Sequence, residues 1–347
     1  MKIAVVSNQA PFVYGGAEYL AETLASRLRG RGHRVDVVRL PFKWYPPQAV
    51  LEHMLAVRLL NVAAGSPDLV IALKFPAYLT PFANKKIWLL HQFRQVYELW
   101  GTPHAGMPDD PPSRRIRDAV TLADTQCLSE TKGLFALSRM VAARLKRNNG
   151  VNVEGILNHP LDRPELYGPG ESGPYFFYPS RLNEIKRQHV AIEAMRHVRS
   201  GFRLVLAGKP DTESYGQELR RRVEEWGLQD KVQFLGWISE EEKARWMAGA
   251  FAALYLPYDE DSYGFVTLEA FHSHKPVLTF TDSGGTDELV EHEVNGLMLE
   301  PTPESLARAM EKLWSAGDRV REMGRAAAET LVHKRIHWDN VLDRLAG

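Results

Sequence analysis

Short apolar runs rich in branched side chains alternate along the chain with longer amphipathic segments. The first run is 2–7, and the segment 17–31 that follows has the spacing of an amphipathic helix ending before Gly32. Comparable apolar runs lie at 34–40, 69–73, 86–90 and 134–138, and a second series lies at 175–179, 203–207, 232–235, 252–256 and 277–280. Strands that alternate with helices in this way predict parallel sheets covered by helices.

The alternation breaks once, in the proline- and glycine-rich stretch 161–174, which we interpret as a linker. A chain of 347 residues is long for one hydrophobic core. The predicted fold class is therefore α/β, with Rossmann-like domains at 1–163 and 164–330 and a ligand cleft between them at the strand ends. The helical end, 331–347, is expected to pack back on the first domain.

The composition indicates a soluble globular protein, with 44% apolar and 25% charged residues. Cys127 is the only cysteine, which excludes an internal disulfide framework and a cysteine-based zinc cage. The N-terminus does not resemble an export leader, and no apolar run reaches the roughly 18 to 20 residues needed to span a bilayer. These features favour a cytoplasmic location.

Charge is divided unevenly between the two halves. Residues 1–165 carry seven more basic than acidic side chains, and residues 166–347 carry seven fewer. A basic half favours contact with anionic lipid at the inner face of a membrane, or with a lipid-phosphate acceptor. Ordinary solvated helix faces are the alternative explanation. No nucleic-acid-binding motif accompanies the basic clusters, so nucleic acid is not an expected partner.

Candidate chemistry is concentrated after the apolar run 252–256. Two carboxylates, Asp261 and Glu269, lie eight residues apart with a glycine loop between them and a predicted helix start near Val266. The N-terminus of a helix favours a phosphate. Glu269 could accept hydrogen bonds from ribose hydroxyls and Asp261 from a sugar, which outlines a nucleotide-sugar site. The amide groups expected to face the phosphate are those of Gly264, Phe265 and Val266.

This segment resembles the signature of glycosyltransferase family four, a family of retaining enzymes in which an acidic residue, seven others and Glu precede an alanine. Further similarities extend over essentially the whole chain. They are Gly15-Gly16-Ala17-Glu18, Asn158-His159-Pro160-Leu161-Asp162, Tyr178-Pro179-Ser180-Arg181-Leu182 with Lys186 after it, and Asn295-Gly296-Leu297.

The resemblance implies a GT-B architecture and a nucleotide-sugar co-substrate, with no separate cofactor and no metal. Arg181 and Lys186 would stabilise the departing diphosphate, because fixed cations lower the barrier to its release. Gly15 and Gly16 would approach the phosphates from the first domain. His91 would lie beside the donor sugar, although a structural histidine is the alternative. Gly208 and Lys209 are expected to contact the donor near its base.

The resemblance leaves both substrates partly open. UDP is favoured over GDP, the sugar is expected to be a hexose, and the acceptor is expected to be a glycan or a lipid-linked compound in polysaccharide or glycolipid assembly. The acceptor is expected to contact the first domain, at Tyr14, Lys74, Phe93 and Arg94. Arg187 stands where the family pattern has glycine, and it is expected to add a third cation on the phosphate side.

Four other interpretations remain. Asp259-Glu260-Asp261 fits the Asp-x-Asp pattern of metal-dependent glycosyltransferases, but its position before Gly264 and Glu269 argues against a metal. A nicotinamide oxidoreductase would need a glycine-rich turn directly after the first strand, where this chain has Asn8 and Gln9. A non-catalytic nucleotide-sugar-binding protein and a sugar-nucleotide epimerase are the alternatives to a transferase.

Overall fold

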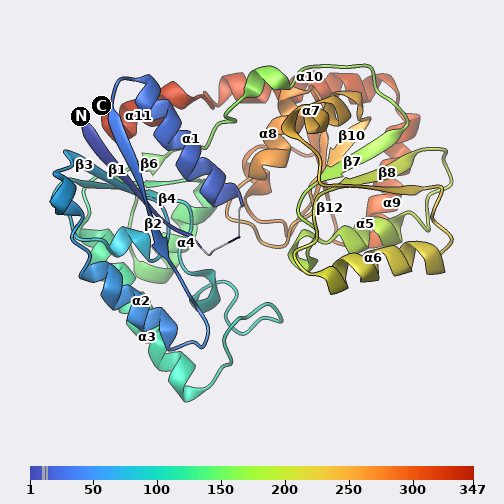
Figure 1. Cartoon of the computed structure of the whole chain (residues 1–347). Coiled ribbons are helices and arrows are strands. Elements are labelled where there is room, and N and C mark those ends of the chain that lie inside the picture. Colours follow the sequence, from blue (N-terminus) through green and yellow to red (C-terminus); the bar gives the residue numbers. More distant parts are fainter. Residues whose placement is uncertain (10–11, 13–14) are drawn as a thin grey trace. The chain divides into compact units, whose positions relative to one another are not determined.

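The structure is a computed structural model that describes residues 1–9, 12 and 15–347. The chain forms two compact units (Figure 1). The first comprises Met1–His159 together with His337–Gly347, and the second comprises Pro160–Ile336. The chain therefore leaves the first unit after β6 and returns to it for the last helix.

The first unit is built on a six-stranded sheet in the order β2-β1-β3-β4-β5-β6, in which every neighbouring pair is parallel. Its strands are β1 (Lys2–Gln9), β2 (Arg34–Pro41), β3 (Leu69–Ala72), β4 (Lys85–Leu89), β5 (Leu134–Ala136) and β6 (Gly155–Ile156). Its helices are α1 (Gly16–Gly30), α2 (Ala49–Arg58), α3 (Pro111–Glu130), α4 (Arg139–Asn149) and α11 (Trp338–Ala346), with short 3-10 helices η1 (Val62–Gly65), η2 (Ala77–Leu79) and η3 (Arg94–Val96).

The second unit repeats the plan with a sheet in the order β12-β11-β10-β7-β8-β9, again parallel throughout. Its strands are β7 (Tyr175–Pro179), β8 (Arg203–Ala207), β9 (Val232–Gly236), β10 (Ala252–Leu254), β11 (Val277–Phe280) and β12 (Gly296–Leu299). Its helices are α5 (Gln188–Ala194), α6 (Glu213–Glu225), α7 (Glu240–Gly249), α8 (Gly264–His272), α9 (Pro303–Ser315) and α10 (Asp318–His333), with 3-10 helices η4 (Pro164–Leu166), η5 (Glu184–Lys186) and η6 (Gly285–Glu288).

Strands become continuous apolar runs where helices cover both faces of a parallel sheet. Phe176, Phe177 and Tyr178 are successive residues of β7, and all three are fully buried. Helices start at side-chain caps that satisfy their first amides. Ser239 caps α7 and exchanges bonds with Glu242 in a capping box. Local caps and burial on both faces together explain why the alternating pattern predicts the elements well.

The strand order fixes where a ligand would be expected in each unit. In the second unit the chain proceeds from β7 to β8 and β9 on one side, then crosses to β10 on the other side of β7. In open α/β sheets, ligands bind outside the carboxyl ends of the strands at such a switch point. A ligand of the second unit is therefore expected at the loops that follow β7 and β10. In the first unit the corresponding point lies between β1 and β3.

Contacts of the last helix tie it to the first unit. The indole of Trp338 meets that of Trp88 edge-on, with ring centroids 6.2 Å apart. Lys86 donates to the carbonyl of Arg344 at 2.9 Å. Arg31 lies on the same side and pairs with Asp339 and Asp343.

The stretch expected as a linker is packed rather than extended away from the domains. Leu161 and Tyr167 are buried in the core of the second unit. The ammonium of Lys275 donates to the carbonyl of Gly170 at 3.0 Å and to the hydroxyl of Ser172 at 2.9 Å. These contacts hold the stretch against the second unit.

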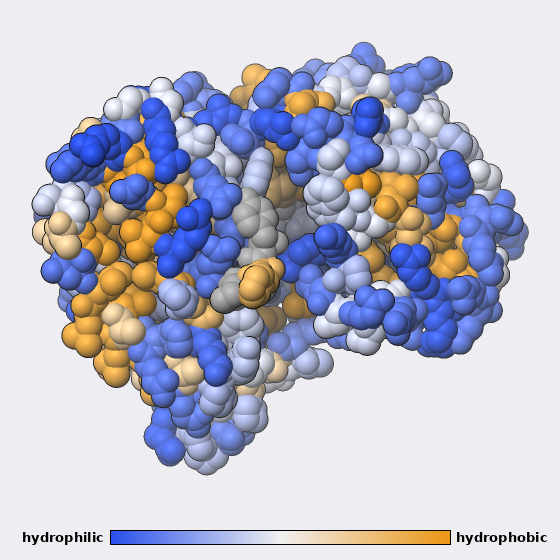
Figure 2. All heavy atoms as spheres, in the orientation of Figure 1, coloured by the Kyte–Doolittle hydropathy of each residue, from blue (hydrophilic) through white to orange (hydrophobic). Residues whose placement is uncertain are grey.

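Apolar side chains are also visible on the surface. Figure 2 shows them gathered on the left of the visible face, over the part of the first unit where β1, β2 and β3 lie in Figure 1. Within the described ranges, no helix combines the length and the apolar character needed to cross a bilayer.

Candidate functional site

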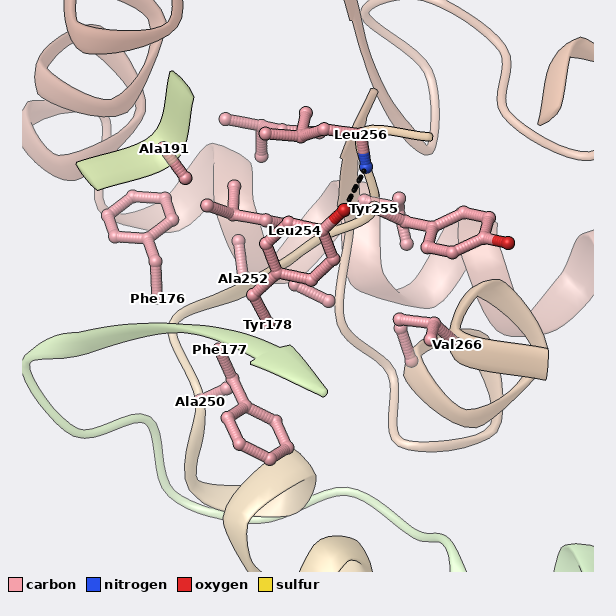
Figure 3. Packing of buried hydrophobic residues seen from close by; sticks show 14 of the residues in the cluster. Phe176, Phe177, Tyr178, Ala191, Ala250, Ala252, Leu254, Tyr255, Leu256 and Val266 are labelled. Carbon is pink, nitrogen blue, oxygen red and sulfur yellow. Dashed lines mark hydrogen bonds between the residues drawn. The ribbon is translucent and has the colours of Figure 1, made fainter. Parts of the chain in front are cut away.

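A buried tyrosine joins the two loops at the switch point of the second unit. Tyr178 lies in β7, and its hydroxyl donates a hydrogen bond to the carbonyl of Lys186. The same hydroxyl accepts a hydrogen bond from the amide of Leu256 at 3.1 Å, as Figure 3 shows. The loop after β7 and the loop after β10 are thereby held together by one side chain.

Lys186 extends from the first of these loops to the second. Its ammonium lies 2.5 Å from Oε1 of Glu260 and 3.1 Å from the hydroxyl of Tyr255. It also lies 5.1 Å from the centroid of the Tyr255 ring, which places it within range of a cation–π interaction. The sequence predicted Lys186 as a phosphate ligand, and the structure shows that its cation is held at the loop before α8.

Arg181, the other predicted phosphate ligand, is more exposed. Its guanidinium approaches both carboxylate oxygens of Asp211, at 3.0 and 3.1 Å, and Asn183 donates to the same carboxylate. The backbone here is fixed by the buried amide of Gln188, which donates to the carbonyl of Arg181 at 2.9 Å. Such a half-exposed pair is worth about 1 kcal/mol or less, so an anionic ligand can compete for the arginine.

Arg187, the predicted third cation on the phosphate side, is paired with a carboxylate inside the second unit. Its guanidinium forms a two-pronged ion pair with Asp282, with both distances 2.8 Å, and donates to the carbonyl of Leu256 at 2.7 Å. Its side chain is only 12% exposed. The charge is neutralised inside the protein, and Arg187 connects the loops after β7, β10 and β11. The pairing could not be predicted, because Asp282 lies 95 residues from Arg187 along the chain.

Helix α8 begins at Gly264, two residues earlier than predicted. The amide of Gly264 is not free, because it donates to the hydroxyl of Ser262 at 3.4 Å. Gly264 has a φ of +70°, and a Cβ atom there would lie 2.5 Å from Cζ of Tyr255. Only glycine therefore allows the start of α8 to pack against the tyrosine that contacts Lys186.

The acidic loop before α8 is supported from behind by the loop after β11. Glu260 donates its amide to the carbonyl of Ser283 at 3.1 Å and accepts at its own carbonyl from Gly285 at 2.9 Å. Gly284 has a φ of +73°, and a Cβ there would lie 2.5 Å from the amide nitrogen of Glu260. Asp261, the predicted sugar ligand on this loop, is 9% exposed.

Glu269, the predicted ribose ligand, is buried one turn into α8. Its Oε1 lies 2.7 Å from the ammonium of Lys243 on α7, and its side chain is 4% exposed. Burial raises the pKa of Glu269, and the nearby Lys243 opposes that rise. The same ammonium also lies 2.8 Å from Oε1 of Glu240.

The predicted base region lies at the ends of β8 and β9. Lys209 extends over the ring of Trp237 at 5.8 Å from its centroid, and Trp237 is largely exposed. Gly208 has a φ of +147°, and its backbone lies against Ser180 at the end of β7. An exposed aromatic face beside a lysine is suited to a planar, negatively charged ligand.

In the first unit, the predicted residues lie near the carboxyl ends of β1, β3 and β4. Gly16 begins α1, and the amide of Gly15 donates to Oε2 of Glu18 at 3.0 Å. The ammonium of Lys74 lies 2.6 Å from the other oxygen of Glu18. Although burial works against it, Lys74 lowers the pKa of Glu18 below its usual value. The predicted acceptor contact Lys74 is thus engaged inside the unit.

The other predicted residues of the first unit are also held internally. His91 places Nδ1 2.7 Å from the carbonyl of Gln92. Phe93 stacks on Phe75 with ring centroids 5.2 Å apart, and Arg94 pairs with Glu98 at 2.9 Å. Tyr14 lies outside the described residues.

Several groups of the site were not found from the sequence. Tyr178, Tyr255 and Glu260 hold Lys186, and Lys243 holds Glu269. Tyr178 is the first residue of the segment Tyr178-Pro179-Ser180-Arg181-Leu182, but the family resemblance assigns it no role. Lys243 carries no signal in the sequence, because a lysine on a helix is usually a solvated residue. In the part of the chain that the structure describes, no three His, Cys, Asp or Glu side chains are grouped to hold a metal ion.

Residues 164–330 match the family model of glycosyl transferases group 1. The match lies within the second unit. The family resemblance predicted from the motifs is thereby confirmed. Alpha-1,3/1,6-mannosyltransferase ALG2 of Mus musculus is 32% identical to this chain over 136 residues. That match covers 39% of this chain and 32% of the mouse protein, so the chain spans about a third of that relative's length.

Solved structures share the arrangement of both sheets. Sucrose-phosphate synthase from Thermosynechococcus elongatus matches with a TM-score of 0.77 and 19% identity, over 98% of this chain and 96% of that one. HepE of Anabaena, solved in complex with UDP, matches with a TM-score of 0.77 and 19% identity, over 100% and 98%. These likenesses confirm the predicted GT-B fold class of two Rossmann-like units.

Proposed function

We propose that this protein transfers a hexose from a nucleoside diphosphate sugar to an acceptor with retention of anomeric configuration. One observation carries the proposal. At the switch point of the second unit, the loop bearing Arg181 and Lys186 is joined through Tyr178 to the loop that leads into α8. Two cations and a helix N-terminus from these loops form a site suited to a diphosphate.

The chemistry follows from the charge that develops on the leaving group. As the glycosidic bond breaks, the diphosphate gains negative charge, and Lys186 and Arg181 would exchange their carboxylate partners for it. Each charged hydrogen bond is worth about 1.5 to 3 kcal/mol, which corresponds to roughly ten- to hundredfold in rate if it strengthens in the transition state. Asp261 would orient the sugar. No protein nucleophile is proposed: the acceptor hydroxyl forms the new bond to the sugar as the bond to the diphosphate breaks, and its proton passes to the leaving phosphate.

The donor proposed first is a UDP-hexose, with a GDP-hexose as the second choice. HepE of Anabaena was solved with UDP, and the mouse relative is named a mannosyltransferase, which favours a nucleotide sugar and a hexose. The ring of Trp237 with Lys209 beside it would receive the base and its diphosphate.

The reaction is proposed to need no metal. Glu260 belongs to the Asp-x-Asp pattern, and its Oε1 is engaged by the ammonium of Lys186 at 2.5 Å. A cation of the protein therefore already lies against this acidic loop, which supports the proposal. Activity in EDTA should equal that with added Mg²⁺ or Mn²⁺, and strict dependence on either ion would contradict the proposal.

The acceptor is proposed to be a glycan or a lipid-linked compound, used at an anionic membrane surface on the cytoplasmic side. The basic first half supports this, and Tyr45, Leu55 and Leu59 of the first unit are exposed apolar groups. Co-sedimentation with vesicles that contain anionic phosphatidylserine should exceed that with neutral vesicles. Equal recovery from both would contradict membrane contact.

The central experiment removes the two cations. Arg181→Ala with Lys186→Ala should reduce donor turnover by roughly a hundredfold or more. Arg221→Ala with Lys312→Ala removes equal charge from exposed positions on α6 and α9 of the same unit, and should leave turnover unchanged. Unchanged turnover in the first double variant would overturn the proposal.

A donor-hydrolysis assay separates this function from its rivals. A transferase releases free sugar and nucleoside diphosphate slowly without acceptor. A binding protein releases neither, and an epimerase converts the sugar while the nucleotide stays attached. Before that assay, a thermal-shift screen of UDP and GDP selects the donor, because a ligand at 100 times its dissociation constant adds about 2.7 kcal/mol to stability.

A further inference from the structure

The carboxylate of Glu269 is held by a cation from a neighbouring helix. Lys243 lies one turn into α7, and its ammonium contacts Oε1 of Glu269 at 2.7 Å and Oε1 of Glu240 at 2.8 Å. Neither Lys243 nor Glu269 is a surface group, since their side chains are 19% and 4% exposed. An ion pair this deep fixes the direction of both side chains.

The pair also sets the charge of the carboxylate. Burial disfavours the charged form of Lys243, yet Glu269 and Glu240 raise its pKa above the usual lysine value, so it remains a cation. Burial likewise raises the pKa of Glu269, and Lys243 is the largest opposing influence. Lys243 is therefore the main group that lowers the pKa of this buried carboxylate.

One oxygen of the carboxylate is left for another donor. Oε2 of Glu269 is buried and accepts no hydrogen bond of normal geometry from the described residues. The hydroxyl of Tyr167 lies close enough to favour the carboxylate weakly, but it donates to Oε2 of Glu240 at 3.1 Å. A buried carboxylate oxygen without a donor is costly, so this atom is suited to receive hydroxyl groups from a ligand.

We infer that Lys243 is the positioning residue of the donor site: it holds Oε1 of Glu269 and so orients the carboxylate, which leaves Oε2 to accept hydrogen bonds from the ribose hydroxyls of the nucleotide. Lys243 itself does not touch the nucleotide. The inference rests on the proposed function, because it requires that a nucleoside diphosphate binds to the second unit.

The test compares nucleotides that differ only in the ribose hydroxyls. Dissociation constants of UDP and 2′,3′-dideoxy-UDP, and of GDP and its dideoxy analogue, are measured by calorimetry on the full chain. The wild type should bind the natural nucleotide about tenfold or more tightly than its analogue, as expected for a hydrogen bond to a charged group. Lys243→Met should reduce this ratio to below about threefold, with the affinity for the dideoxy analogue unchanged.

Two further variants separate positioning from stability. Lys243→Arg keeps the cation and should retain most of the ratio. Lys243→Met combined with Glu269→Gln removes both charges, so it should fold more stably than Lys243→Met alone, and it should still fail to discriminate. Should Lys243→Met not fold, this double variant and Lys243→Arg provide the comparison.

The pH profile gives a second readout. Lys243 lowers the pKa of Glu269, so the ratio in Lys243→Met should reach its full value at a higher pH than the ratio in the wild type. A Lys243→Met variant with the same ratio and the same pH profile as the wild type would overturn the inference while leaving nucleotide binding intact. Failure of the wild type to bind either UDP or GDP would overturn the proposed function and this inference with it.

Discussion

The hydroxyl of Tyr178 donates a hydrogen bond to the carbonyl of Lys186, eight residues further along the chain. The tyrosine is fully buried in the central strand β7, whereas the lysine carries its ammonium out to the acidic loop after β10. A core residue thus determines where a cation of the candidate diphosphate site is held. The first prediction tests this link.

Tyr178→Phe removes a donor to Lys186 and an acceptor for the amide of Leu256. Two buried backbone groups lose their partner, so we expect a loss of about 1 to 3 kcal/mol in urea unfolding and a severalfold fall in kcat/KM. Tyr175→Phe, on the same strand, removes a bond to the carbonyl of Trp246 and serves as the control. Equal kcat/KM in the two variants would show that Tyr178 supports the fold alone.

Gly264→Ala places a methyl group against Tyr255 and forces a left-handed backbone on alanine. We expect UDP affinity to fall about tenfold, with strain of order 1 to 3 kcal/mol in thermal unfolding. Gly227→Ala is matched in backbone, with a φ of +63°, but its added Cβ meets nothing within 4 Å. That control should be mildly destabilised and bind UDP normally, and a similar loss of affinity in both variants would contradict the local role of Gly264.

Arg187→Lys tests the ion pair that connects three loops. Lysine cannot reproduce the two parallel bonds to Asp282 or the bonds to the carbonyls of Leu256 and Pro257. We expect a loss of about 2 to 4 kcal/mol in the free energy of unfolding by urea. Lys231→Arg, which changes a single bond to the carbonyl of Val198, should cost far less. A loss below about 0.5 kcal/mol in Arg187→Lys would mean that the ion pair contributes little.

The buried carboxyl group of Asp124 should make the stability of the first unit depend on pH. It is fully buried and accepts hydrogen bonds from Tyr78 and Tyr97 at 2.9 and 2.8 Å. Burial raises its pKa to about 7, with Tyr97 and Tyr78 opposing the rise. The folded state therefore holds a proton that the unfolded state releases near pH 4, and its contribution to stability declines as the pH rises from about 4 to about 7.

Asp124→Asn removes this titration. Relative to the wild type, the variant should become progressively more stable between pH 4 and pH 7, by up to roughly 4 kcal/mol, since each pKa unit corresponds to about 1.4 kcal/mol. Urea unfolding at several pH values measures the difference. A constant difference across the range would show that Asp124 has an ordinary pKa.

The fold was largely predictable because each parallel strand carries its own apolar signal. The two strands that the pattern missed, Gly155–Ile156 and Gly296–Leu299, each lie at the edge of a sheet. An edge strand has one neighbour and a weaker apolar requirement, so two or four residues of it are hard to distinguish from a turn.

The residues of the candidate site could be predicted where they lie close together in the sequence. The side chains with which they form ion pairs could not. Lys186 and the glycine loop before Glu269 were identified from local motifs. The carboxylates that neutralise the cations, Glu260 for Lys186 and Asp282 for Arg187, are 74 and 95 residues away along the chain. Such pairings depend on which strand ends the topology brings together. The local pattern around each residue does not indicate which distant residue will lie beside it.

The return of α11 to the first unit has a consequence for dissecting the molecule. Residues 160–336 are one uninterrupted segment, whereas the first unit is assembled from both sides of it. In topological terms, the second unit is an insertion between β6 and α11. A truncated chain that stops at residue 336 would therefore expose the indole of Trp88 and leave Arg31 without its two carboxylates. Excision of 160–336 with a short bridge would preserve those contacts.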